Sequence, residues 1–384
     1  LRQSGCRTIR VCLVVLRSPD GRADSPGTAK RRNDLALVST GGRPVNSIRG
    51  AIARLVNRQN LGEGEAEDVM GQVLGGGATP VQAGAFLAAL QMKGQTAEEI
   101  AGCALAMRRL ARPVRSQRRD LVDISGTGGD QAGTFNISSI AAFVVAGAGV
   151  AVAKHGARSM SQRCGSADLL EALGVNLNLS PEQVAACIDE VGIGFLFAPH
   201  LHPALEHASR ARAEIGVHTI FAVLGPLTNP AGAQAQVVGV YSAGLTEPVA
   251  RALGTLGSRA AFVVAGADGM DEFSTTGVNK VSRLDAGNVS TFALDALDLG
   301  LPRARLGDLM GGTPADNCAC ARAILGGERG PRRDIVLLNA AATLCVAGRS
   351  SDLGEALNLA AHALDSGEAR RKLDDLIAFS RRFG

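Results

Sequence analysis

The sequence predicts an α/β protein that consists of a small all-helical subdomain and a larger α/β domain with a central sheet. Apolar residues recur at helical spacing throughout residues 48–112. From residue 121 onward, short segments that are apolar along most of their length alternate with helical ones. Such strands are typical of a sheet covered by helices on both faces. We therefore expect a helical subdomain at 48–115, with helices near 181–214 joining it, and an α/β domain at 116–384.

Four helices are predicted in the first region. Ile48, Ile52 and Leu55 lie on one face of the first helix, and a second run with the same spacing follows. Thr79-Pro80 combines an N-cap residue with proline at the first helical position. Thr96–Glu99 is a capping box, in which two side chains satisfy backbone N–H groups at a helix start. These start signals and the spacing together predict separate helices joined by short loops.

Strands are predicted where apolar runs are bounded by glycine, proline or polar residues. They lie at residues 121–125, 150–153, 193–197, 235–241 and 260–265. Helices are predicted at 138–147, at 166–173 and after the capping box that begins at Ser180. The chain from about Pro314 onward is predicted to be mainly helical.

A glycine-rich loop, Gly126-Thr-Gly-Gly-Asp130, follows the first predicted strand, and Thr134-Phe-Asn-Ile-Ser-Ser139 leads from it into a helix. Glycine lets the backbone approach a ligand closely, and a helix N-terminus offers free N–H groups and partial positive charge. We therefore expect an anion site suited to phosphate. The spacing matches neither the dinucleotide fingerprint nor the Walker loop. The alternative is a structural turn between strand and helix.

A basic segment, Lys154-His-Gly-Ala-Arg-Ser-Met-Ser-Gln-Arg163, follows the second predicted strand. In open α/β sheets, ligands bind at the carboxyl ends of the strands. Lysine and arginine at such an edge suit phosphate or pyrophosphate, because both carry a positive charge and several donors. The alternative is a solvated charged loop.

An acidic loop, Gly266-Ala-Asp268-Gly-Met-Asp271-Glu272, follows the strand predicted at 260–265. Carboxylate oxygens close together beside a substrate phosphate are the hard ligands that Mg²⁺ prefers, with water completing the octahedron. The alternative is an acidic hairpin loop without a metal.

Composition and charge argue against several classes of protein. Residues 48–384 hold 31 basic and 33 acidic side chains, so no overall positive charge favours nucleic acid. Eight cysteines are scattered without a CxxC pair, which indicates free thiols and a cytoplasmic protein. No apolar run approaches the length that spans a membrane, and we expect no membrane partner.

Residues 1–47 differ from the rest, since they carry nine basic and three acidic side chains and show no sustained period. This composition predicts a disordered basic tail that adds nothing to the fold. The alternative is a basic arm for targeting or for nucleic acid.

Taken together, these segments resemble the anthranilate phosphoribosyltransferase family over residues 48–384. The motifs that carry the resemblance are GTGGD at 126–130, TFNIS at 134–138, KHG-R at 154–158, GSAD at 165–168, FLFAP at 195–199, LGPLTNP at 224–230 and DG-DE at 268–272. The resemblance implies a nucleoside phosphorylase/phosphoribosyltransferase-like fold, with the active site at the hinge between the two domains, and a homodimer joined through the helical subdomains. It also implies Mg²⁺-dependent transfer of the phosphoribosyl group of phosphoribosyl pyrophosphate to anthranilate, in tryptophan biosynthesis.

The resemblance further implies roles for individual residues. Lys154 and Arg212 would be catalytic, with Arg212 facing the carboxylate of anthranilate. Ser138, Asp271 and Glu272 would hold magnesium. The substrates would be bound by Gly126, Gly129, Asp130, Thr134, Asn136, Ile137, Ser138, Ser139, Lys154, His155, Gly156, Ala157, Arg158, Ser161, Gln162, Ser166 and Arg212. His155 would bind or support rather than act as an obligate base.

Near the acceptor, this sequence departs from the family pattern. Ala157 stands where the family motif has an asparagine that contacts anthranilate, and Ala222 stands where the family has Asn after Thr-Ile-Phe. Gln162 and Cys164 replace serines, and Ser139 replaces a threonine. Two further readings therefore stay open: a phosphoribosyltransferase for another aromatic acceptor, and a non-catalytic relative that binds nucleic acid.

Overall fold

Residues 47–383, apart from 131 and 160–162, are described by a computed structural model. The predicted disordered tail at 1–47 falls outside these residues except for Ser47. In the part of the chain that the structure describes, no helix has both the length and the hydropathy needed to cross a membrane.

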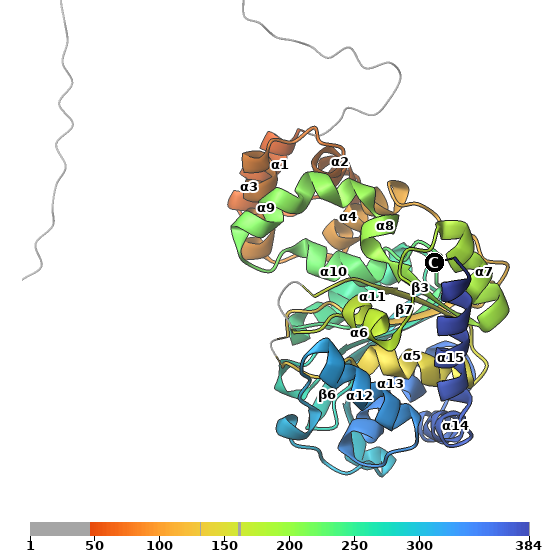
Figure 1. The fold of residues 1–384 in the computed structure, drawn as a ribbon. Helices are drawn as coiled ribbons and strands as arrows, with labels where there is room; N and C mark the ends of the chain where they lie inside the picture. Colours follow the sequence, from red (N-terminus) through yellow and green to blue (C-terminus); the bar gives the residue numbers. More distant parts are fainter. Residues whose placement is uncertain (1–46, 131, 160–162, 384) are drawn as a thin grey trace, which may run out of the picture. The chain divides into compact units, whose positions relative to one another are not determined.

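The first helices form a bundle that we call the helical subdomain. They are α1 (Ile48–Val56), α2 (Glu63–Leu74), α3 (Pro80–Lys93) and α4 (Ala97–Arg109), and they lie together in Figure 1. Thr79 and Thr96 are the N-caps of α3 and α4, each within a reciprocal capping box, as predicted. Glu99 is fully buried in the bundle and bonds Lys93 Nζ at 2.9 Å and the backbone N–H of Leu61 at 2.9 Å. A buried carboxylate thus fixes the loop before α2 to the start of α4.

The larger part is built on a seven-stranded sheet with the order β3-β2-β1-β4-β5-β6-β7. The strands are β1 (Val122–Gly126), β2 (Val152–Gly156), β3 (Ile193–Phe197), β4 (Ala235–Gly239), β5 (Ala260–Ala265), β6 (Val278–Asp285) and β7 (Asn288–Asp295). The first five run parallel, and β6 and β7 add an antiparallel hairpin. The predicted fold class is confirmed, but the hairpin is absent from the sequence-based assignment.

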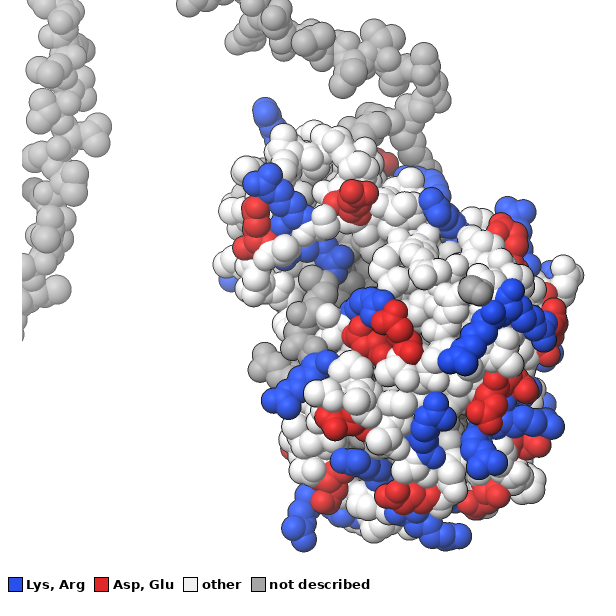
Figure 2. Space-filling model, viewed as in Figure 1, with Lys and Arg blue, Asp and Glu red and all other residues white. Residues whose placement is uncertain are grey.

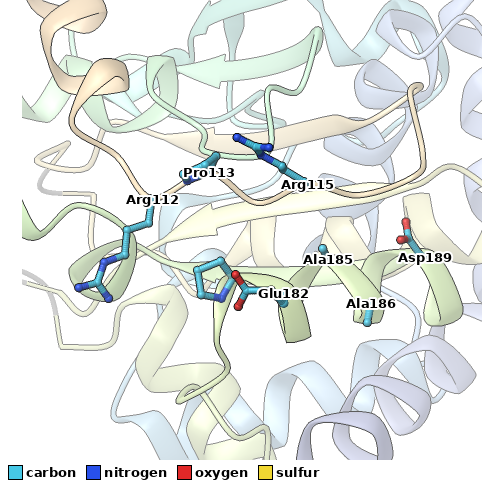
Figure 3. A pocket seen from close by; sticks show the side chains of 8 residues that line it. Arg112, Pro113, Arg115, Glu182, Ala185, Ala186 and Asp189 are labelled. Atoms are coloured by element: carbon cyan, nitrogen blue, oxygen red, sulfur yellow. The ribbon is translucent and has the colours of Figure 1, made fainter.

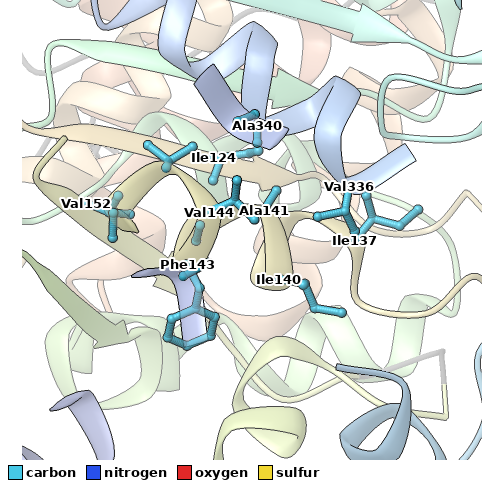
Figure 4. Close-up of a cluster of buried hydrophobic side chains, with 14 of the residues drawn as sticks. Ile124, Ile137, Ile140, Ala141, Phe143, Val144, Val152, Val336 and Ala340 are labelled. Carbon is cyan, nitrogen blue, oxygen red and sulfur yellow. The ribbon is translucent and has the colours of Figure 1, made fainter. Parts of the chain in front are cut away.

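Two sides of the sheet are buried by different helices. Ile124 and Val152 pack against α5 (Ile137–Gly147) and α13 (Pro331–Val346), the cluster in Figure 4. Alternate residues of β5, such as Val263, instead pack with α10 (Ile220–Leu227), α11 (Thr246–Thr255) and the helical subdomain. The side chains of a strand point alternately to its two faces, so burial on both faces explains why the strands are so apolar.

Four more helices cover the side of the sheet on which α5 lies. They are α6 (Ser166–Leu173), α12 (Pro314–Leu325), α14 (Leu353–Asp365) and α15 (Glu368–Ser380). Their buried residues belong to the same apolar cluster as α5. The start at Pro314 and the helical nature of the chain beyond it match the prediction.

The helices predicted near 181–214 divide between the two parts of the protein. The helix α9 (Glu206–Ile215) packs on α2 and α3, whereas α7 (Pro181–Val191) packs on β3 and α15. Only Gly192 separates α7 from β3, so this helix must lie along the sheet. A short helix α8 (Ala198–Leu201) and a 3₁₀ turn at Pro203–Leu205 connect β3 to α9.

Strand order reverses between β1 and β4. From β1 the chain proceeds through β2 to β3 at one side, and then crosses to β4 and β5 on the other. The loops that leave β1 and β4 must therefore diverge, which opens a crevice at their carboxyl ends. The fold thus places the glycine-rich loop, which follows β1, at the position where such sheets bind ligands.

Gly102 and Gly84 provide a matched test of the packing in the helical subdomain. A Cβ at Gly102 would lie 2.1 Å from the carbonyl oxygen of Glu63, whereas a Cβ at Gly84 would meet nothing closer than 3.9 Å. We expect Gly102→Ala to destabilise the protein by about 1–3 kcal/mol, because α2 and α4 must separate. Gly84→Ala should stabilise it by about 0.5–1 kcal/mol, because alanine has the lower helix-formation cost. Denaturant melts of both variants measure the difference, and equal effects would show that α2 and α4 are not closely packed.

Candidate active site

The carboxyl ends of the parallel strands bring the acidic loop against the glycine-rich loop. The backbone N–H of Gly128 donates to Asp271 Oδ2 at 2.6 Å. A Cβ at Gly126 would lie 2.1 Å from that same oxygen, so only glycine permits this approach. The two motifs are about 140 residues apart in sequence and meet because β1, β4 and β5 are adjacent.

Three carboxylates converge there. Asp271 and Glu272 are buried, with 7% and 8% of their surface exposed, and the backbone N–H of Asp271 lies 3.5 Å from Asp130 Oδ2. Burial, followed by repulsion from Asp130 and Glu272, raises the pKa of Asp271 well above its usual range. Burial also raises the pKa of Glu272 to about 7, although Lys154 and Ser138 oppose the shift. Asp268, the other carboxylate of the predicted loop, is exposed. Burial of these carboxyl groups together therefore favours protonation, unless a cation balances their charge.

The N-terminus of α5 faces this cluster. The backbone N–H of Ser138 donates to Glu272 Oε1 at 3.2 Å. Asn136, the residue before the helix, donates through Nδ2 to Cys164 O at 3.0 Å and accepts from Asn317 Nδ2 at 2.8 Å. Ile137 and Ser139, predicted to bind substrate, are buried in the first turn of α5, and Thr134 forms a β-bridge with Met310 just before it. The predicted helix N-terminus is therefore present and directed at the carboxylates.

Lys154 lies within β2 rather than after it. The predicted strand ends at residue 153, but pairing with β3 continues through Lys154↔Phe195 to Gly156↔Phe197. The ammonium is buried, with 4% of the residue exposed, and donates to Ile124 O at 2.7 Å. Burial lowers the pKa of Lys154, and the charges of Asp123 and Glu272 oppose this shift. A buried cation thus stands beside the acidic cluster.

His155 forms a neutral buried pair with His202, which is absent from the predicted site. Their ring centroids are 5.0 Å apart, and His155 Nδ1 lies 3.0 Å from Gly225 O. Burial lowers the pKa of His155 to about 4 and that of His202 to about 3. Since Gly225 O can only accept, Nδ1 carries the proton and Nε2 is left as a buried acceptor that has no partner within the described residues.

The segment after β2 contains residues that lie beside the candidate site and residues that hold the local structure together. A Cβ at Gly156 would lie 2.2 Å from Ser166 Oγ, and that hydroxyl donates to Ala157 O at 3.3 Å. Ala157 is exposed and adjacent to this contact. Arg158 instead forms ion pairs with Asp168 and Glu171 on α6, which raise its pKa. Of the predicted site residues, Ser161 and Gln162 lie outside the described residues.

Arg212 and His218 lie at the borders of the candidate site. Arg212 lies on α9 with its guanidinium 4.8 Å from the ring centroid of Phe221, and burial lowers its pKa. No described contact brings it to Lys154. His218 packs directly on Gly129, where an added Cβ would lie 2.1 Å from the imidazole, and it stacks on Tyr241 at 5.3 Å. Sequence analysis missed His218 because nothing local indicates this long-range contact.

A cavity of about 740 Å³ lies elsewhere, between the segment after α4 and the first turns of α7 (Figure 3). It is lined by Arg112, Pro113, Arg115, Pro181, Glu182, Ala185, Ala186 and Asp189. None of the predicted site residues lines it, and its charges are mixed. We therefore base the functional interpretation on the strand ends rather than on this cavity.

Two family models match the chain, one for each part of the fold. The model described as glycosyl transferase family, helical bundle domain, matches residues 49–111, and the one described as glycosyl transferase family, a/b domain, matches residues 118–370. Together they cover the helical subdomain and most of the sheet domain.

Individual relatives agree with these models. The chain is 54% identical over 332 residues to the anthranilate phosphoribosyltransferase of Moorella thermoacetica, covering 86% of this chain and 98% of that protein. It is 48% identical in sequence to the Thermus thermophilus enzyme of this name, which is known from a crystal structure. The TM-score between the two structures is 0.82, and the match covers 86% of this chain and 99% of that one. The Saccharomyces cerevisiae enzyme, solved in complex with PRPP and Mg, is 27% identical with a TM-score of 0.79, covering 88% and 98%. The chain therefore belongs to the anthranilate phosphoribosyltransferase family.

Proposed function

We propose that this protein transfers the phosphoribosyl group of phosphoribosyl pyrophosphate to anthranilate, forming N-(5-phosphoribosyl)anthranilate and pyrophosphate in tryptophan biosynthesis. The observation that carries the proposal is the meeting of three features at the carboxyl ends of β1, β2 and β5. These are the glycine-rich loop 126–130, the N-terminus of α5, and the buried Lys154 beside Asp271 and Glu272.

The diphosphate would occupy the crevice at these strand ends. Positive φ at Gly128 and Gly129 lets the loop backbone approach a ligand closely, and the N-terminus of α5 adds a partial positive charge. The ribosyl pyrophosphate would be bordered by Asp130, Thr134 and residues 136–139. Ser166 would border it from the side of the crevice where Gly156 lies. Lys154 would contact the pyrophosphate through its ammonium group, which acts as a compact point charge.

The carboxylates fit a magnesium ion that is shared with the substrate. Asp271 and Glu272 are buried beside Asp130, and burial raises the pKa of both, so a divalent cation at this place would favour their ionised forms. Within the described residues, no three His, Cys, Asp or Glu side chains are arranged to enclose a metal alone. This suits Mg²⁺, which is commonly held by one or two carboxylates together with substrate phosphates and water. When bound by Ser138, Asp271 and Glu272, the ion would neutralise charge on the departing pyrophosphate.

The chemistry requires positioning and charge stabilisation rather than a protein nucleophile. The amine nitrogen of anthranilate forms a bond to the anomeric carbon while the bond from that carbon to pyrophosphate breaks. Pyrophosphate leaves with the electron pair, and the nitrogen loses a proton. Lys154 stabilises the leaving charge, and the walls of the crevice align the reactants.

The acceptor would bind on the side of β2 that faces α10. Arg212 would pair with its carboxylate, and His155, Ala157 and Arg158 would border the pocket. A second candidate acceptor class, another aromatic amine, is favoured by one observation: both Ala157 and Ala222 lack the amide groups of the family motif.

We also propose that the protein is a cytoplasmic homodimer joined through its helical subdomains. Exposed apolar side chains support this interface: Val56, Val81 and Met92 are 68%, 81% and 79% exposed on α1 and α3. A mass of twice the chain mass in solution light scattering tests it, and a monomer at assay concentration would contradict it.

The direct test of function is the release of pyrophosphate from phosphoribosyl pyrophosphate. We expect rapid, Mg²⁺-dependent release only when anthranilate is present. Release that requires a different aromatic amine would support the second acceptor class. No release with any aromatic amine, in protein that binds nucleic acid, would favour the non-catalytic reading.

Removing one carboxylate should test the metal assignment. Asp271→Asn and Glu272→Gln each keep the shape of the side chain but remove a charge that would face the metal. We expect kcat to fall about a hundredfold or more, as for other losses of transition-state charge stabilisation. Asp268→Asn is the matched control, because Asp268 is exposed on the same loop. Wild-type turnover of both buried variants across a magnesium titration would show that the assignment is wrong.

Restoring an amide at position 157 should test the acceptor side. A neutral hydrogen bond contributes about 0.5–1.5 kcal/mol, so Ala157→Asn should lower the KM for anthranilate roughly 2- to 12-fold. The double variant with Ala222→Asn is measured as well, since the effects of neighbouring changes need not add. Ala378→Asn, on the exposed face of α15, controls for general effects of the substitution. Unchanged or weaker anthranilate kinetics in both single variants and the double would indicate a pocket shaped for another acceptor.

A further inference from the structure

Strands β1 and β2 separate at the end nearest the candidate active site. Their register begins normally at Val122↔Val152, with Val122 N–H donating to Ala151 O at 3.0 Å. A continued parallel ladder would pair Ile124 N–H with Ala153 O, and His155 N–H with Ile124 O. Neither bond forms, whereas β1 pairs with β4 along its whole length.

Side chains satisfy the backbone groups that the ladder leaves open. Asp123 Oδ1 accepts from Ile124 N at 2.8 Å and from His155 N at 3.2 Å. Asn229 Nδ2 donates to Ala153 O at 2.7 Å, and Lys154 Nζ donates to Ile124 O at 2.7 Å. All four backbone groups therefore have partners, and each partner is a side chain standing between the two strands.

Asp123 is the centre of this arrangement. It is 1% exposed, and its Oδ2 accepts from Asn229 Nδ2 at 2.8 Å. Burial raises the pKa of Asp123 to about 6, and the charge of Lys154 and the Asn229 hydrogen bond oppose the shift. Burying a carboxylate is unfavourable unless it is paired, and an apolar residue here would let the ladder close. A buried carboxylate at this position of β1 is therefore energetically unfavourable, and strand pairing does not require it.

We propose that Asp123 is a positioning residue, which with Asn229 holds β1 and β2 apart so that the side chain of Lys154 lies between them and is directed at the pyrophosphate. This inference rests on the proposed function, because it acts through Lys154. Among the described residues, both oxygens of Asp123 accept hydrogen bonds from backbone N–H groups or from Asn229, so we assign it a positioning role and not a catalytic one. The same oxygen that bonds His155 N–H also fixes the backbone from which the His155 imidazole extends.

A double-mutant cycle separates this role from a merely structural one. Asp123→Asn removes the negative charge and turns an amide NH₂ toward the NH₂ of Asn229. In steady-state kinetics with saturating anthranilate, we expect Asp123→Asn to lower kcat/KM for phosphoribosyl pyrophosphate at least about tenfold. In a Lys154→Gln background the same change should alter it by no more than about threefold, because two residues that act as one unit do not add.

Glu99→Gln is the matched control, since Glu99 is also a fully buried carboxylate that bonds a lysine and backbone N–H groups, far from the strand ends. It should lower the melting temperature but leave kcat/KM within about twofold of wild type. If Asp123→Asn does not fold, Asn229→Ala replaces it in the cycle with the same expectation.

Three outcomes are distinguishable. A wild-type protein that releases no pyrophosphate with its substrates overturns the proposed function. An active wild type in which Asp123→Asn resembles Glu99→Gln overturns the positioning role. An equal loss with and without Lys154 also overturns it, because Asp123 would then act by another route.

Discussion

The burial of Lys154 beside acidic side chains is the constraint on which the arrangement of this protein depends. Only 4% of the residue is exposed, and burial lowers its pKa, whereas the charges of Asp123 and Glu272 oppose this shift. Glu272 in turn is held by the first turn of α5. Asp123 lies in β1, Lys154 in β2 and Glu272 in the loop after β5, so the sheet must bring these three strands to one edge. The stability of this edge and the chemistry of the site rest on the same set of charges.

The reversal of strand order explains why this edge is open. Helices cover both faces of the sheet, but the loops after β1 and β4 diverge, and the glycine-rich loop and the acidic loop meet in the space between them. On the face of the molecule shown in Figure 2, positive and negative side chains are interspersed. The binding of an anionic substrate is therefore assigned to a local site rather than to the field of the whole molecule.

Sequence reasoning recovered the parts of the fold that have local signals. The caps at Thr79 and Thr96 and the strands at 193–197 and 260–265 follow from patterns within a few residues. The β6–β7 hairpin was missed because β7 is mostly exposed and lacks an apolar pattern. The end of β2 was missed because Lys154 and His155 are polar, although the ladder with β3 continues through them. Contacts between distant segments, such as His218 on Gly129, have no local signal at all.

Isothermal titration calorimetry of phosphoribosyl pyrophosphate measures whether the strand-end cluster binds its diphosphate through magnesium. Titrations would be made in Mg²⁺ and, separately, in EDTA. We expect one site per chain in Mg²⁺ and an affinity at least about tenfold weaker in EDTA, because no cation would then balance the diphosphate beside the buried carboxyl groups. Equal affinity in the two buffers would show that magnesium does not link the substrate to this cluster.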